Sequence, residues 1–351
     1  MSKNFELPER VNFEITSKCN QSCIHCFASS EHEEKDMSTK DVRDFIDQLK
    51  GTSVKYLSFS GGEPLIRSDI FDLIDHVKKR ELYIGLSTNG TLIDENTAVK
   101  IAESGVDSVA VSIHGFNEST HDTIVRKKGA YLKAIEGIKN LLAENVPTRV
   151  LTTVMRQNYT EISDIRKGLE KHGINVNKIL HFSAMPLRPA GRANVNWNEL
   201  VLSPDELWHL WEERWGSIGK DIFGDCPLPI PIIETLDVFL KEKPYDLTSE
   251  KLKKICEGCV AGRIFCEITS SGDVLLCPFV RLPIGNIGKN TLENIWKTSY
   301  LIKKVQNREF TGKCGNCQNA DICGGCRAEA FVRNGDILSS DPTCKFVPHM
   351  Y

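Results

Sequence analysis

The sequence predicts an α/β fold of six strand–helix units followed by a loop-rich module that is dense in cysteine. Two observations predict it: short apolar runs alternate with segments of helical period in the first half, and glycine and cysteine replace such segments after residue 256. The six runs, rich in β-branched and aromatic residues, are 11–16, 56–61, 83–88, 108–114, 148–154 and 178–185. Repeated strand–helix units favour parallel strands with right-handed crossovers. Because six units fall short of a closed barrel, a partial, open barrel and a doubly wound sheet are the two candidates.

Three segments between the runs are predicted to be helices, because their apolar residues recur at helical spacing. They are residues 38–50, 69–80 and 129–145. Ser38 is the predicted N-cap of the first segment. One face of that segment collects the apolar residues Val42, Phe45, Ile46 and Leu49.

The residue composition and pattern divide the chain into three regions. Residues 1–200 hold the strand–helix units, 201–255 are a proline-rich helical bridge, and 256–351 are the cysteine-rich module. Within the bridge, residues 203–215 are a predicted helix that starts at a Ser-Pro cap. The module has little apolar core of its own, so we expect bound metal to stabilise it.

The composition predicts a cytoplasmic protein. The chain is 40% hydrophobic and 26% charged with a net charge of -3, which gives no sign of a nucleic-acid or membrane-surface partner. No apolar run approaches the ~20 residues of a membrane-spanning helix, and the first residues lack the apolar core of a signal peptide. The reducing cytosol disfavours disulfides, so the 13 cysteines, an odd number, favour metal binding.

Three cysteines, Cys19, Cys23 and Cys26, directly follow the first predicted strand in "CNQSCIHC". In parallel β/α architecture, residues just past a strand line the active-site face. A structural zinc site takes four ligands, and His25 is sterically awkward as the fourth because it lies between two cysteines. The pattern therefore favours a [4Fe–4S] cluster with one open iron over a zinc site or structural thiols.

Polar motifs follow the next three predicted strands. In "SFSGGEPLIR" (58–67), Gly61 and Gly62 permit close backbone approach, and Glu63-Pro64 fixes a turn. "LSTNG" (86–90) and "VSIHG" (111–115) follow the third and fourth strands, and Arg126 comes after "HDTIV". Each motif alone is explained by a turn or a cap at a strand end. Their order at successive strand ends is hard to explain as core packing.

In this order, the motifs resemble those of radical S-adenosylmethionine (SAM) enzymes. The resemblance implies that the three cysteines hold a [4Fe–4S] cluster whose open iron chelates SAM, which is cleaved to a 5′-deoxyadenosyl radical that abstracts a substrate hydrogen. It implies that Gly61, Gly62, Glu63 and Pro64 lie at the methionyl ammonium, Ser87, Thr88 and Asn89 near the ribose and methionine, Ser112 at the ribose and Arg126 at the SAM carboxylate. Many relatives carry an acidic residue where His114 stands, and the resemblance assigns His114 no role.

A second cysteine system lies near the C-terminus. It comprises Cys259, Cys266, Cys277, Cys314, Cys317, Cys323, Cys326 and Cys344. These thiols suffice for two four-ligand iron–sulfur clusters or two zinc sites. Together with "GDVLLCPF" and "CGGCRAEA", they resemble the SPASM domain of radical SAM enzymes, which carries up to two auxiliary [4Fe–4S] clusters.

The two resemblances together imply a partial (β/α)6 TIM-like barrel with a C-terminal loop-rich α+β iron–sulfur module. They imply that Cys259, Cys277 and Cys326, with Cys266, hold the nearer auxiliary cluster. Cys314, Cys317, Cys323 and Cys344 then hold the farther one. Cys226 and Cys256 fall outside the pattern and are expected to be free buried thiols.

The substrate is less constrained by the sequence. Enzymes with this domain commonly modify a ribosomally made peptide or a protein side chain, and a second group acts on tetrapyrroles in haem-type biosynthesis. We favour the peptide, with propionate side chains of a tetrapyrrole as the alternative. Arg188 and Arg192 suit a tetrapyrrole's propionates or a peptide's acidic leader, or else have a purely structural role. A non-catalytic iron–sulfur scaffold or electron carrier is a third reading, which the SAM-contact motifs disfavour.

The resemblance also implies partners. Because the first predicted strand starts at residue 11, we expect no recognition domain of about 90 residues within the chain, and a separate peptide-recognition protein instead. A reductant such as flavodoxin or ferredoxin supplies the electron. Since the radical attacks water-exposed groups, the site should close around SAM and substrate, with the C-terminal module as lid and wall.

Overall fold

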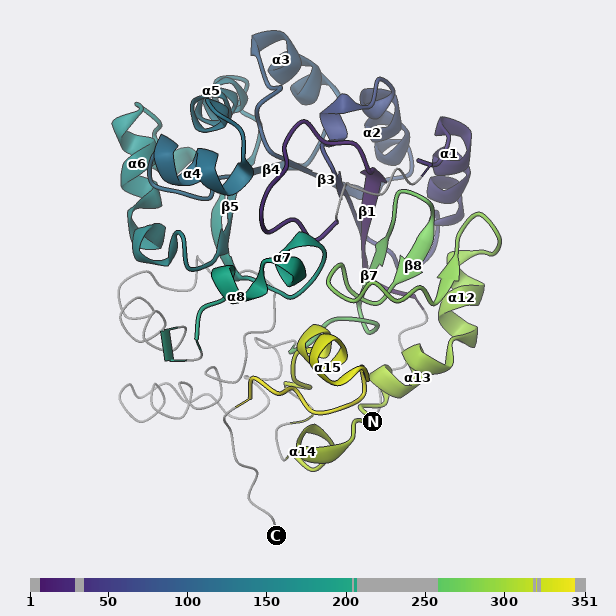
Figure 1. Ribbon diagram of the computed structural model, residues 1–351. Coiled ribbons are helices and arrows are strands. Elements are labelled where there is room, and N and C mark those ends of the chain that lie inside the picture. The colour runs from purple at the N-terminus through teal and green to yellow at the C-terminus, as the bar shows by residue number, and fades with distance from the viewer. Residues whose placement is uncertain are drawn as a thin grey trace, which may run out of the picture.

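A computed structural model describes residues 7–28, 35–203, 205–206, 258–317, 320 and 323–344. Within them the strands form a 9-stranded sheet in the order β6-β5-β4-β3-β2-β1-β7-β8-β9 (Figure 1). The first six are β1 (Arg10–Thr16), β2 (Tyr56–Gly61), β3 (Tyr83–Thr88), β4 (Ser108–Ser112), β5 (Thr148–Val154) and β6 (His181–Pro186). They pair in parallel in sequence order, which confirms the predicted strands and the partial, open barrel.

Helices cover the outside of the curved sheet (Figure 1). They are α1 (Thr39–Gln48), α2 (Ile70–Lys78), α3 (Glu95–Glu103), α4 (Glu118–Val125), α5 (Ala130–Ala143) and α6 (Ile165–Lys171). The three predicted helices correspond to α1, α2 and α5. Ser38 caps α1 as predicted, because its hydroxyl accepts a hydrogen bond of 3.2 Å from the backbone N–H of Asp41. None of the described helices is long and apolar enough to cross a membrane.

Short elements fill the connections. The 3-10 helices are η1 (Pro64–Ile66), η2 (Tyr159–Asp164) and η3 (Val176–Lys178), and β6 is followed by α7 (Arg192–Val195) and α8 (Trp197–Leu200). Because η3 takes up the start of the predicted strand 178–185, β6 begins only at His181. The predicted helix 203–215, apart from its first residues, lies outside the described residues, as do Cys226 and Cys256.

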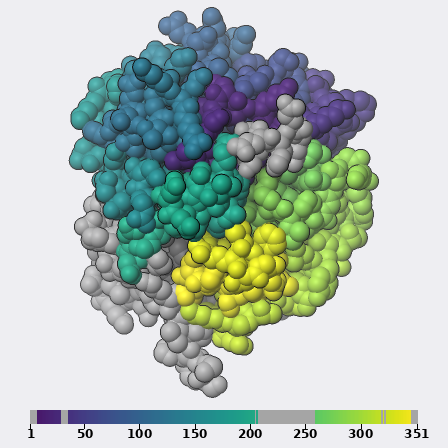
Figure 2. Space-filling view, viewed as in Figure 1, coloured from purple at the N-terminus to yellow at the C-terminus, as the bar shows by residue number. Residues whose placement is uncertain are grey.

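The C-terminal module, residues 258–344, continues the sheet of the barrel. Its elements are β7 (Phe265–Ile268), β8 (Asp273–Leu275), β9 (Gly285–Asn286), α12 (Leu292–Thr298), α13 (Tyr300–Gln306), α14 (Gly312–Gly315) and α15 (Arg327–Asn334). β7 pairs in parallel with β1, with Val11 opposite Cys266. Figure 2 shows the module, in green and yellow, packed directly against the barrel and the teal segment before residue 200.

The two faces of the sheet differ in polarity. On the helix side, the Phe13 ring packs edge-on against Phe45 of α1 at a centroid distance of 5.6 Å. On the inner side, the Asn12 amide donates hydrogen bonds of 2.7 Å to Ser60 Oγ and to Glu267 Oε1 of β7. The apolar core therefore lies between sheet and helices, and the barrel interior is polar, which leaves the interior for a polar site.

Candidate functional site

The cysteine loop, residues 17–28, follows the carboxyl end of β1 and carries Cys19, Cys23 and Cys26, all half-buried. Burial raises the pKa of the Cys19 thiol, and it raises the pKa of Cys23 to about 12 with further increases from Cys26 and Cys19. Cys26 therefore lies close enough to Cys19 and Cys23 to disfavour their thiolate forms, and Cys19 has the same effect on Cys23. Three thiolates are stable together here only if a bound cationic group offsets their charge.

The Gly-Gly-Glu segment after β2 packs against the start of this loop. The backbone N–H of Gly62 donates to the Thr16 carbonyl, and that of Glu63 donates to the Lys18 carbonyl, both at 2.8 Å. A Cβ atom at Gly62 would lie 2.0 Å from the Lys18 carbonyl oxygen. Gly61 has φ +117°, and a Cβ there would lie 2.4 Å from the Thr16 carbonyl oxygen. Both glycines thus provide the close backbone approach that the sequence predicts.

The Glu63 carboxylate is completely buried beneath the cysteine loop. Its Oε1 accepts hydrogen bonds from Thr88 Oγ1 at 2.7 Å and from the Leu65 N–H at 3.1 Å, and its Oε2 accepts one from the Asn89 N–H at 2.8 Å. Burial raises the pKa of Glu63, and these hydrogen bonds oppose the increase. The carboxylate is therefore held in one orientation by the end of β3.

Asn20, which lies inside the cysteine loop, ties that loop to the segment after β3. Its Oδ1 accepts a hydrogen bond of 2.7 Å from Asn89 Nδ2, and its own Nδ2 donates one of 3.0 Å to Thr91 Oγ1. The predicted site residue Asn89 therefore contacts the loop directly, whereas Ser87 lies half-buried further back on β3. Sequence reasoning missed Asn20, because nothing in the spacing of the cysteines distinguishes it from its neighbours.

His114, after β4, packs against the cysteine loop from a third side. Its ring is buried and lies edge-on to the His25 ring at a centroid distance of 4.4 Å. Its Nδ1 accepts a hydrogen bond of 3.2 Å from the Thr153 N–H. Burial lowers the pKa of His114 well below its usual range and lowers the pKa of His25 to about 3. Both rings are therefore neutral at physiological pH, and the predicted residue Ser112 lies half-buried two residues before His114.

Arg126 lies where α4 ends next to the cysteine loop. The backbone N–H of Ile24 donates to the Ile124 carbonyl at 2.9 Å, and that of Ser22 donates to the Val125 carbonyl at 3.3 Å. Arg126 follows directly, is exposed and has the left-handed φ of 52°. A left-handed conformation is costly for a residue other than glycine and is often found at functional sites. The structure thus brings Arg126 to the rim of the cysteine loop.

Arg188 and Arg192, for which the sequence leaves open a substrate-carboxylate role and a structural role, are buried behind the cysteine loop. Arg192 donates from Nε to the Cys23 carbonyl at 2.8 Å and from its backbone N–H to the Cys26 carbonyl at 2.9 Å. Arg188 Nη1 lies 3.5 Å from Glu329 Oε1 in the C-terminal module. Both arginines therefore contact the protein's own groups at the junction of barrel and module.

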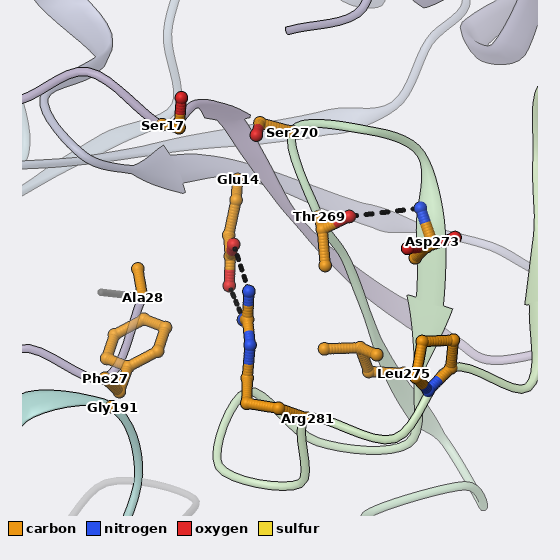
Figure 3. Close-up of a pocket in the computed structure, with 11 residues that line it drawn as sticks. Glu14, Ser17, Phe27, Ala28, Gly191, Thr269, Ser270, Asp273, Leu275 and Arg281 are labelled. Carbon is orange, nitrogen blue, oxygen red and sulfur yellow. Dashed lines mark hydrogen bonds and ion pairs between the residues drawn. The ribbon is translucent and has the colours of Figure 1, made fainter. Parts of the chain in front are cut away.

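A cavity of about 290 Å³ opens beside the cysteine loop (Figure 3). Its walls come from the barrel, the cysteine loop and the module: Glu14, Ser17, Phe27, Ala28, Gly191, Thr269, Ser270, Asp273, Leu275, Arg281 and Pro283. Arg281 and Glu14 form an ion pair inside it, with 3.2 Å between Arg281 Nη2 and Glu14 Oε2. Because Phe27 directly follows Cys26, the cavity adjoins the third cysteine of the loop.

A second carboxyl group, Glu267, lies on the inner face of β7 near Glu14. It is completely buried, and the Asn12 amide donates to both of its oxygens at 2.7 and 2.9 Å. Burial, followed by the neighbouring Glu14 carboxylate, raises the pKa of Glu267 well above its usual range. Glu267 therefore keeps its proton to a higher pH than an exposed glutamate does, beside the Glu14–Arg281 ion pair. Sequence reasoning missed this group, because one glutamate in a short strand is typical of a solvent-facing residue.

The C-terminal cysteines form two groups, within which one thiol raises the pKa of another. Burial raises the pKa of Cys326 to about 12, and Cys259 is among the groups that add to it. Burial likewise raises the pKa of Cys323 to about 12, with additions from Cys314 and Cys344. The structure therefore brings Cys326 together with Cys259, and Cys323 together with Cys314 and Cys344.

The remaining cysteines of the module are less clearly grouped. The backbone N–H of Cys317 donates to the Cys314 carbonyl at 3.5 Å, and Cys277 is half-buried after β8. Cys266 is completely buried in the apolar core, and no other cysteine is among the groups that raise its pKa. In the described residues no three His, Cys, Asp or Glu side chains converge on a single metal ion. An iron–sulfur cluster differs from such an ion, because each thiolate binds a different iron.

Comparisons with known proteins match both halves of the chain. The family model of the radical SAM superfamily matches residues 13–168, and that of the iron–sulfur cluster-binding SPASM domain matches residues 249–327. An AdoMet-dependent heme synthase of Methanosarcina barkeri is 28% identical over 97% of both chains. The mycofactocin maturase MftC of Mycolicibacterium smegmatis is 28% identical over 97% of this chain and 84% of its own.

Solved structures share the fold. Streptococcus suis SuiB bound to the precursor peptide SuiA superposes with a TM-score of 0.76, at 19% identity over 97% of this chain and 76% of SuiB. Native anSMEcpe with bound AdoMet superposes with a TM-score of 0.66, at 19% identity over 95% of this chain and 93% of its own. These likenesses confirm the partial barrel.

The cofactors follow from the two family matches. A radical SAM domain binds a [4Fe–4S] cluster and SAM, and a SPASM domain binds auxiliary iron–sulfur clusters. The cysteine loop fits such a cluster, because it offers three mutually close thiols and the buried Glu63 carboxylate beside them. In the module, the neighbouring thiols of Cys259 and Cys326, and of Cys314, Cys323 and Cys344, fit auxiliary clusters in the same way.

Proposed function

Because this chain is a member of the radical SAM superfamily with a C-terminal SPASM domain, we propose that it modifies a side chain or chain end of a ribosomally made peptide or protein. The cavity beside the cysteine loop carries this proposal. Its volume of about 290 Å³ is at the small end of the ~300–1,000 Å³ typical of ligand pockets. A cavity of this size suits a peptide side chain or chain end better than a whole tetrapyrrole macrocycle.

We assign the first cluster to Cys19, Cys23 and Cys26, and SAM to the strand ends around them. When bound, the cluster and SAM supply the 5′-deoxyadenosyl radical that takes a hydrogen atom from the substrate. The residues proposed to contact SAM are Gly61, Gly62, Glu63, Pro64, Ser87, Thr88, Asn89, Ser112 and Arg126. Within this set Glu63 offers the buried negative charge for the SAM ammonium, and exposed Arg126 suits its carboxylate.

The hydrogen bonds refine the roles of two residues in this set. The Thr88 hydroxyl donates to Glu63, and it accepts from the Gly90 N–H at 3.0 Å. The Asn89 amide is bonded to Asn20, and its backbone N–H to Glu63. We therefore assign Thr88 and Asn89 to positioning Glu63 and the cysteine loop.

We assign the auxiliary ligands by neighbourhood. Cys259, Cys277 and Cys326 hold one cluster with Cys266 as the weakest candidate, because Cys266 is completely buried on β7 and no other cysteine is among the groups that raise its pKa. Cys314, Cys317, Cys323 and Cys344 hold the other. The residue ranges proposed for barrel, bridge and module are 1–200, 201–255 and 256–351.

The cavity walls give the substrate a specific environment. Phe27 and Phe279 pack edge-on at a centroid distance of 5.6 Å, which places aromatic surface beside the cysteine loop. The cavity's charged side chains are Glu14, Asp273 and Arg281, which together carry a net negative charge. This balance favours hydrogen-bond donors such as peptide N–H groups over the several propionates of a tetrapyrrole.

A tetrapyrrole substrate is the second candidate, and the heme synthase relative is the observation that favours it. Both candidates need a reductant such as flavodoxin or ferredoxin, since SAM cleavage consumes an electron. A peptide substrate adds a separate peptide-recognition protein as a proposed partner.

Turnover with defined substrates distinguishes the two candidates. The anaerobically reconstituted protein is incubated with SAM, dithionite and either peptides encoded beside its gene or an iron coproporphyrin, and products are detected by mass spectrometry. We expect 5′-deoxyadenosine together with a peptide of altered mass. Turnover of the porphyrin alone would instead establish the second candidate. The control is a Cys19→Ala, Cys23→Ala, Cys26→Ala variant, which should form no 5′-deoxyadenosine.

A further inference from the structure

The segment between β6 and α8 contacts both cysteine systems. At its C-terminal end, Arg192 donates to the backbone carbonyls of Cys23 and Cys26, and Asn196 Nδ2 donates to the Ile24 carbonyl at 2.9 Å. At its N-terminal end, Arg188 pairs with Glu329 of α15. Figure 1 shows α7 and α8 between the barrel and α15, as these contacts require.

The Arg188–Glu329 pair is sealed from solvent next to a proposed cluster ligand. Both side chains are 3% exposed. Glu329 lies in the first turn of α15, whose N-cap is Cys326. The backbone N–H of Cys326 donates to Asp341 Oδ2 at 2.7 Å, so the start of α15 is fixed in position. A cation and an anion therefore lie in the low-dielectric surroundings of Cys326.

Charges in such surroundings act strongly on a neighbouring sulfur. Arg188 Nη1 lies 3.5 Å from Glu329 Oε1, so a buried positive charge and a buried negative charge both lie beside the start of α15, where Cys326 is the N-cap. Gaining an electron makes an iron–sulfur cluster more negative, so a nearby cation stabilises the reduced form and a nearby anion destabilises it.

We propose that Arg188 raises the reduction potential of the auxiliary cluster ligated by Cys326 and that Glu329 lowers it. This inference rests on the proposed assignment of Cys326 as a ligand. Arg188 is then a positioning and electrostatic residue that acts through the cluster, and the segment it belongs to also holds the loop of the first cluster. Its burial and its ion pair across the junction explain why it does not face the substrate cavity.

The test is an EPR-monitored redox titration in the Cys19→Ala, Cys23→Ala, Cys26→Ala background, where only auxiliary clusters contribute. Arg188→Gln should lower one auxiliary midpoint potential, and Glu329→Gln should raise the same one. Arg188→Lys keeps the positive charge, so its midpoint potential should stay closer to that of the parent. The matched control is Arg333→Gln, since Arg333 also contacts Glu329, at 2.9 Å, but its side chain is 40% exposed. Solvent screening should make its shift the smaller one.

Two results would overturn the inference: no shift in either variant, or shifts of the same sign in both. Arg188→Gln leaves a buried carboxylate without this partner, and misfolding would appear in far-UV circular dichroism and iron content. In that case the midpoint potential of Glu329→Gln alone tests the inference, because glutamine keeps the shape of the glutamate side chain and removes its charge. If the Cys19→Ala, Cys23→Ala, Cys26→Ala variant contains no iron, both the ligand assignment and the inference are contradicted. The proposed function is tested separately, by measuring 5′-deoxyadenosine formation by the parent protein.

Discussion

The cysteine loop and the C-terminal cysteines hold their thiols in different ways. In the loop, Cys19, Cys23 and Cys26 are close in sequence and half-buried. Strand ends and loops on all sides bond to the loop backbone, through Glu63, Ile124 and the Arg192 segment. The backbone of the loop is thus held in place by hydrogen bonds from the barrel and from the segment after β6.

In the module, the grouped thiols come from segments that are distant in sequence. Cys259 precedes β7 while Cys326 caps α15, and the Cys259 N–H donates to the Cys323 carbonyl at 2.9 Å. Asp341 connects the two groups, because its side chain accepts from the Cys326 N–H and its backbone N–H lies 3.3 Å from Cys314 Sγ. From this difference we expect a bound cluster to add little to the stability of the barrel loop and to contribute directly to the stability of the module.

The largest expected effect separates these two roles directly. Cys23→Ala should reduce 5′-deoxyadenosine formation by about a hundredfold or more, because it removes a cluster ligand, and should leave the fold intact. Cys326→Ala should lower the melting temperature and the iron content, because it removes a proposed ligand at a buried position, 7% exposed, at the start of α15. Both variants are measured by circular dichroism, iron analysis and SAM cleavage. Equal losses of stability would contradict the comparison.

The next largest effect tests the support beneath the cysteine loop. Gly62→Ala places a Cβ atom 2.0 Å from the Lys18 carbonyl oxygen, where backbone must move. We expect a loss of about 1–3 kcal/mol in the free energy of unfolding, measured in urea, together with weaker SAM binding. The control is Gly288→Ala, since Gly288 is exposed and its nearest contact is the Asn286 side chain at 3.1 Å. That change should stay within about 0.5 kcal/mol. Similar losses in both would show that the close approach is unimportant.

Features formed by residues close together in the chain were predictable from the sequence. The strands β1 to β4 and the motifs that follow them in the chain were predictable. Each strand is a local apolar run, and each motif comes directly after its strand. Ser38 was predictable as a cap for the same reason. The cysteine loop is likewise a local pattern, so its thiols, Glu63 and Asn89 could be placed together before the fold was known.

Long-range arrangements were not predictable in this way. β7 is four residues long, and its pairing with β1 brings together positions such as Asn12 and Glu267, which are far apart in the sequence. Arg188 and Arg192 carry no local sign that they face the cluster loop and α15. Their burial comes from tertiary packing, which no spacing rule encodes.

The pH dependence of stability tests the pairing of β7, in the module, with β1, in the barrel. The native state keeps the proton of Glu267, which the unfolded state releases above the ordinary pKa of 4.5. Stability should therefore fall as pH rises from there to the raised native pKa, by about 1.4 kcal/mol for each unit of difference. Thermal unfolding measured at increasing pH above 4.5 should show this slope, and Glu267→Gln should flatten it. The exposed Glu199→Gln is the control and should keep the slope. A slope that survives in Glu267→Gln would assign it to another group.

The smallest effect concerns the single side chain that links the loop to β3. Asn20→Ala removes the hydrogen bonds to Asn89 and Thr91 but leaves the backbone contacts of the loop at Lys18 and Ile24. We expect a loss of about 0.5–1.5 kcal/mol in stability and a several-fold weaker SAM affinity, measured by equilibrium binding to the reconstituted protein. Asn20→Asp is the paired variant, because it keeps the acceptor for Asn89 and loses the donor to Thr91. If the aspartate restores affinity, the bond from Asn89 carries the effect; if both variants bind SAM as tightly as the parent, the barrel holds the cysteine loop by backbone contacts alone.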